Sequence, residues 1–73
     1  MMEIKLSKEE IEKAIKIMTA ESGTKSFAAL ARDIGLKETT FRSAIHNNSI
    51  RLVDFIDAAE TMGFEVVAVK KEQ

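Results

Sequence analysis

The sequence of 73 residues has no cysteine and a single histidine. Without cysteine the chain has no disulfide and no thiolate metal site, and one histidine is too few for a histidine metal cluster. We therefore expect no metal and no cofactor. No apolar run approaches the roughly 20 residues of a membrane-spanning helix, and the N-terminus lacks the apolar core of a signal peptide. The expected location is the cytoplasm, with no membrane partner.

The residues that enzymes use are also scarce. One histidine and no cysteine leave no nucleophile with a neighbouring base, and three isolated glycines do not make a phosphate-binding loop. We expect no enzymatic activity, and nothing in the sequence indicates a small-molecule ligand.

The length sets the number of domains and predicts a partner subunit. A chain of 73 residues forms a single domain, residues 1–73. A domain of this size buries only about 60% of its unfolded surface, and small domains without disulfide or metal are commonly stabilised by association. We therefore expect a homodimer.

Charges are unevenly distributed, although the net charge is only −1. Residues 24–51 carry five basic side chains against two acidic ones, whereas the segments before and after them are net acidic. A basic centre of this kind is typical of a nucleic-acid contact surface. Ordinary scatter of charges also produces excesses of this size, so both interpretations stay open here.

The hydrophobic pattern predicts four helices between two short strands. Residues 2–6 alternate in polarity and predict a strand, and residues 7–22 predict a helix with a Ser7–Glu10 capping box and an end at Gly23. Further helices are expected over about 27–34, 37–47 and 52–62, and the β-branched residues 64–70 predict a second strand. The expected fold is α+β and mainly α, with the two terminal strands paired antiparallel.

The central segment, about residues 26–47, has the pattern of a helix-turn-helix. Gly35 would reverse the chain with a positive φ, and Ala31 is small where the two helices would approach. Apolar residues stand where this motif packs on the rest of a domain: Leu30, Ile34, Leu36, Phe41 and Ala44. Polar residues fall on the opposite face of the second helix, as in a helix that binds the DNA major groove: Lys37, Glu38, Thr39, Arg42, Ser43 and His46.

The segment FAALARDIGLKETTFRSAIHNN resembles the helix-turn-helix of the phage-repressor family of DNA-binding proteins (Cro/cI-like, XRE-type). The segment IRLVDFIDAAETMGFE is similar to that family's fourth helix, so the resemblance covers residues 26–64. It implies a four-helix Cro/cI-like domain and a sequence-specific transcriptional regulator of double-stranded DNA. The terminal strands further resemble those of small Cro-like repressors, which bind a pseudo-palindromic operator as a homodimer.

Carried over by position, the resemblance implies base-reading residues at Glu38, Thr39 and Ser43, with Arg42 beside them. The implied phosphate contacts lie before the second helix and after the third: Ser26, Asn47, Asn48 and Arg51. Lys37 and Lys25 are expected to attract phosphate in a general way.

Three positions depart from the family pattern. The family commonly has Gln where Phe27 stands, Ser or Thr where Lys37 stands, and a neutral donor where Glu38 stands. A carboxylate only accepts hydrogen bonds, so Glu38 suits a cytosine amino group. The equally open alternative is that Glu38 only stabilises the first turn of its helix.

The segment 64–70 is apolar on both faces, with Phe64 and Val66 on one and Val67 and Val69 on the other. Such a strand needs two covering surfaces, and the helices of its own chain supply one. We expect the dimer interface here, at Phe64, Val66, Val67 and Val69. An alternative function is an antitoxin or another protein-interaction module built on a helix-turn-helix.

Overall fold

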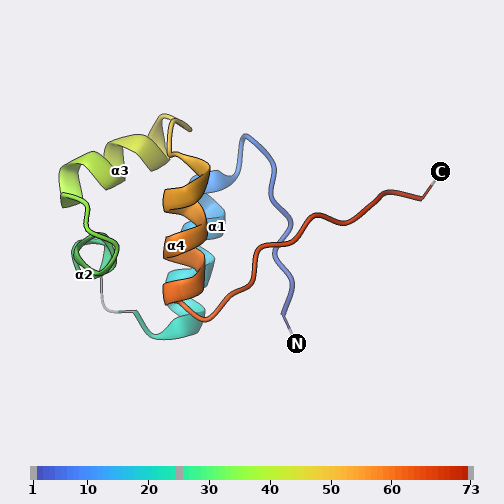
Figure 1. Cartoon of the computed structure of the whole chain (residues 1–73), viewed down its shortest axis with the longest axis horizontal. Coiled ribbons are helices and arrows are strands. Elements are labelled where there is room, and N and C mark those ends of the chain that lie inside the picture. Colours follow the sequence, from blue (N-terminus) through green and yellow to red (C-terminus); the bar gives the residue numbers. More distant parts are fainter. Residues whose placement is uncertain (1, 25, 73) are drawn as a thin grey trace.

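The computed structural model describes residues 2–24 and 26–72, and in these residues it contains four helices (Figure 1). They are α1 (Ile11–Ser22), α2 (Phe27–Asp33), α3 (Glu38–His46) and α4 (Leu52–Thr61). Helix α2 packs against α3 and α4, and α3 also packs against α1. In Figure 1, α2 is seen end-on whereas α3 runs across the view, so these two helices cross steeply.

The core lies where the four helices meet. Its largest fully buried side chains come from the first three helices: Ile15, Leu30, Phe41 and Ile45. Helix α4 closes the core with Phe55, Ala58 and Ala59. These residues recur at the three- and four-residue spacing of one helix face, and their burial is the main stabilising contribution to so small a domain.

The turn between α2 and α3 lies at the position that the sequence predicted. Residues 34–37 connect the two helices, and Gly35 has a φ of +80°, a conformation that costs residues with a Cβ atom energy. The Leu36 N–H donates to the Ala31 carbonyl at 2.8 Å. Ala31 itself is fully buried, as expected for a small residue at a close helix contact.

Helix α1 begins four residues later than predicted. Glu10 stands at its N-cap position and makes no side-chain capping bond, so the predicted Ser7–Glu10 capping box is wrong. The Glu10 N–H donates instead to the Ser7 carbonyl at 3.0 Å. This closes a separate turn before the helix and uses the Glu10 N–H, which in a capping box would donate to the Ser7 hydroxyl. The predicted end at Gly23 is confirmed, with a φ of +73°.

The predicted α+β class is wrong, because the structure has no strand anywhere in residues 2–24 and 26–72. The mainly helical character is confirmed. Residues 2–6 and 64–72 run as irregular segments that cross in Figure 1. Among the described residues, no backbone hydrogen bond joins one segment to the other. A β-sheet forms only through such bonds between neighbouring strands. The pattern of residues 2–6 and 64–70 therefore predicted strands that these segments do not form.

Leu52 has the spacing of the buried Phe55 and Ala59, but as the first residue of α4 it is 68% exposed. Among the residues that the structure describes, none of the helices is both long and apolar enough to cross a membrane.

Leu30 and Leu52 allow a matched test of this core. We expect Leu30→Ala to lower the free energy of unfolding by about 2–5 kcal/mol, because it leaves a cavity between α2 and α3. The same substitution at the exposed Leu52 should cost less than about 0.5 kcal/mol. Urea unfolding followed by circular dichroism measures both. Equal losses for the two variants would contradict the packing described here.

Candidate nucleic-acid interface

Helix α3 has one buried face and one exposed polar face. Phe41 and Ile45 are fully buried and anchor the helix to the domain. The four predicted base-reading residues are all exposed on the same helix: Glu38, Thr39, Arg42 and Ser43. Residues four apart lie on one side of a helix, so these four side chains form two adjacent rows that point away from the core.

Glu38 and Arg42 form the closest ion pair on this face. The Arg42 Nε donates to Glu38 Oε2 at 2.7 Å. The Arg42 guanidinium also lies over the ring of Phe27, with its Cζ 4.9 Å from the ring centre. Such a cation–π contact contributes about 0.5–1 kcal/mol at an exposed site. Arg42 is therefore held on one edge by a carboxylate and on one face by an aromatic ring.

Phe27 connects this arginine to the core. It is half-buried at the first position of α2, and its ring meets the fully buried Phe41 edge-on, with 5.9 Å between ring centres. The position of Arg42 on α3 is thus tied to the packing of α2 against α3.

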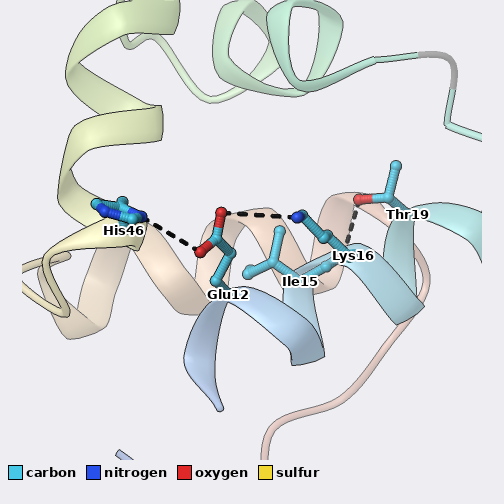
Figure 2. Close-up of polar contacts among 5 residues, drawn as sticks. All are labelled: Glu12, Ile15, Lys16, Thr19 and His46. Atoms are coloured by element: carbon cyan, nitrogen blue, oxygen red, sulfur yellow. Dashed lines mark hydrogen bonds and ion pairs between the residues drawn. The ribbon is translucent and has the colours of Figure 1, made fainter. Parts of the chain in front are cut away.

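The far end of α3 contacts α1. Figure 2 shows His46 facing Glu12, with the His46 Nδ1 3.5 Å from Glu12 Oε1. The other Glu12 oxygen lies 3.8 Å from the Lys16 ammonium group one turn along α1. The carboxylate beside His46 on α3 therefore comes from another helix, α1.

Two predicted phosphate contacts lie at helix starts. The Ser26 hydroxyl accepts a hydrogen bond from the Ala29 N–H at 3.1 Å, so it caps α2. Lys37 stands at the N-cap position of α3 without a side-chain cap, and its side chain is exposed. Within residues 2–24 and 26–72 it has no ion-pair partner. Lys25 lies outside the described residues.

The asparagines after α3 have structural roles. The Asn47 side-chain amide donates to the Ser43 hydroxyl at 3.3 Å. Asn48 has a φ of +55°, a left-handed conformation that asparagine tolerates better than most residues. This allows the Ser49 N–H to donate to the Ala44 carbonyl at 2.8 Å, which ends α3 and turns the chain toward α4.

Arg51, immediately before α4, is already paired. Its Nε and Nη2 donate to the two carboxylate oxygens of Asp54 at 3.0 and 3.3 Å. These hydrogen bonds, and secondarily the charge of Asp54, raise the pKa of Arg51 above its ordinary value. Arg51 therefore stays cationic, but a phosphate would have to share it with Asp54.

The two terminal segments line an apolar hollow of about 450 Å³ away from α3. Phe64 and Val66 are half-buried and pack against the core of their own chain. Val67 and Val69 are 64% and 81% exposed. Of the four predicted dimer residues, two are thus largely used within the chain and two are free for a partner.

The structure brings together residues that the sequence did not connect. The four-residue spacing of Glu38 and Arg42 is visible in the sequence and is the signal that could have predicted their ion pair. The contact of Arg42 with Phe27 depends on the crossing of α2 and α3, which the spacing does not encode. The comparisons with protein-family models, with curated proteins and with solved structures found no match to this chain.

Substitutions at Asn48 test its role in the turn after α3. We expect Asn48→Gly to keep or slightly raise the free energy of unfolding, and Asn48→Ala to lower it by about 1 kcal/mol, because alanine disfavours a positive φ. Chemical unfolding of both variants measures this difference. If the two variants are equally stable, the backbone at residue 48 does not need the left-handed conformation.

Proposed function

We propose that the protein is a sequence-specific transcriptional regulator whose helix α3 binds the major groove of double-stranded DNA. The observation that carries the proposal is the pair of exposed rows formed by Glu38, Thr39, Arg42 and Ser43 on a helix anchored by Phe41 and Ile45. Helix α2 crosses behind α3 and supports it. The resemblance of residues 26–64 to the phage-repressor family supports the same function.

The charges of the helix-turn-helix indicate moderate attraction to DNA. Lys37 and Arg32 are exposed cations without ion-pair partners in the described part of the chain. Arg42 and Arg51 each have an adjacent carboxylate. The overall charge of −1 is compatible with this function only because the acidic residues concentrate outside residues 24–51. Binding should therefore depend on contacts to base edges as well as on phosphate.

A second copy of the chain completes the proposal. A single helix in one major groove gives little affinity, and dimers place two such helices about one DNA turn apart. The exposed Val67 and Val69 border the apolar hollow of the terminal segments. Covering these valines in a homodimer would bury apolar surface that a monomer exposes to water. The regulator would then bind a pseudo-palindromic operator.

A dimer seated on its operator would repress by occlusion, because it excludes other proteins from the same DNA. A regulator of the phage-repressor type would act in the cytoplasm, where its DNA lies.

Salt dependence tests the DNA-binding proposal. We expect the affinity for a duplex selected from a random pool to fall roughly 100-fold between about 50 and 200 mM salt, as for about four neutralised phosphates per dimer. Lys37→Gln should reduce the slope of log K against log salt by about 0.9 per subunit. Fluorescence anisotropy of a labelled duplex measures both.

The control for Lys37→Gln is Lys8→Gln, which removes an exposed positive charge before α1 and should leave the slope unchanged. Failure to select any duplex, or binding that does not depend on salt, would contradict the proposal. Salt-independent capture of a protein by the apolar hollow would instead favour the protein-interaction alternative.

A charge in the apolar hollow tests the homodimer. We expect Val67→Asp to convert the dimer to a folded monomer. Residue 67 is exposed in a single chain, so the new carboxylate would lose its water only in the dimer interface, where that loss is costly. The matched control is Val53→Asp, since Val53 is 59% exposed on α4 and does not line the hollow. Sedimentation velocity at micromolar concentration measures the oligomeric state, and a monomeric wild-type chain would refute this part.

A further inference from the structure

The Arg42 guanidinium makes two contacts within the chain, although its side chain is exposed. Its side chain is 54% exposed, yet the guanidinium meets Glu38 at one edge and Phe27 at one face. The Phe27 ring is in turn fixed by its edge-on contact with the buried Phe41. A guanidinium with both an edge and a face supported loses less conformational freedom when it binds.

The edge that Glu38 occupies determines which donors remain. The Arg42 Nε is the nitrogen bonded to Glu38 Oε2. The two terminal nitrogens, Nη1 and Nη2, have no hydrogen bond to any described residue. Their outer N–H groups are parallel, which is the geometry that matches the O6 and N7 acceptors of guanine in the major groove.

The charge of Glu38 favours a base over a phosphate as the partner of Arg42. A carboxylate 2.7 Å from the Arg42 Nε neutralises much of its attraction for phosphate and repels the phosphate itself. The guanine acceptors are uncharged, so they are not repelled in this way. The pair therefore favours a hydrogen-bonded base contact over a general electrostatic contact.

We propose that Arg42 is the residue that recognises guanine, and that Glu38 and Phe27 are positioning residues that aim it. This inference rests on the proposed DNA-binding function and names the base that α3 recognises. It also gives Glu38 a third role, beside the cytosine contact and the helix stabilisation that the sequence left open. Glu38 acts through Arg42 and does not itself accept from cytosine.

The test begins with a duplex selected from a random pool by the wild-type chain. Each guanine of a half-site is then replaced in turn by 7-deazaguanine, which lacks the N7 acceptor, or by hypoxanthine, which keeps O6 and N7 and lacks only the minor-groove amino group. We expect one position where 7-deazaguanine weakens binding at least about 5-fold. Hypoxanthine at that position should leave the affinity within about 2-fold.

The variants assign this sensitivity to residues. Arg42→Ala should bind the guanine duplex and the 7-deazaguanine duplex equally, so that the ratio of their dissociation constants falls to about 1. Glu38→Gln and Phe27→Leu should each reduce the ratio at least about 2-fold, and Glu38→Gln should also bind unrelated DNA more tightly because a negative charge is gone. Glu60→Gln, in the last turn of α4, removes the same charge and should keep the wild-type ratio.

Each contrary result has a distinct meaning. If no duplex is selected, the proposed function fails and the inference fails with it. If a duplex is bound but no guanine is sensitive to 7-deazaguanine, or Arg42→Ala keeps the sensitivity, the proposed function stands and the guanine contact is refuted. If Glu38→Gln keeps the full ratio and changes the preferred base at another position, Glu38 reads a base itself. Thermal unfolding shows which variants are folded. If Phe27→Leu does not fold, the ratio of dissociation constants for Glu38→Gln alone tests the positioning role.

Discussion

The contact between α2 and α3 is the constraint on which the rest of the molecule depends. Leu30, Ala31, Phe41 and Ile45 are fully buried where these helices meet the rest of the domain, and the turn at Gly35 sets their crossing. Because Phe41 and Ile45 face inward, the polar residues of α3 face outward. The same crossing places Phe27 beneath Arg42. Packing of the core thus arranges the candidate interface.

The helices themselves were largely predictable, because the apolar spacing of α1, α3 and α4 is a property of the sequence alone. The start of α1 was not, since a capping box and a local turn compete for the same Glu10 N–H. The irregular backbone of the two terminal segments, which were expected to be strands, was not predictable either. Alternation shows which side chains prefer burial, but a strand also needs a partner for its backbone. Within residues 2–24 and 26–72 the structure shows no such partner for residues 2–6 or 64–70.

The candidate site was also predictable only in part. The exposed positions of Glu38, Thr39, Arg42 and Ser43 agree with the helical spacing of the sequence. Their interactions required the structure: Arg42 meets a ring from another helix, and His46 meets Glu12 of α1. The charge count over residues 24–51 already includes Glu38, the partner of Arg42, but it leaves out Asp54, the partner of Arg51. It therefore overstates the attraction that phosphate experiences.

The most direct test of the central claim is a titration of the ¹⁵N-labelled protein with duplex DNA at low salt, followed by amide chemical shifts. If α3 binds the major groove, the largest shift changes should fall within residues 37–51, which include α3, the turn after it and the residue before α4. The core residue Ile15 and the terminal segments should change little. No shift changes, or changes confined to residues 2–6 and 64–72, would contradict the account.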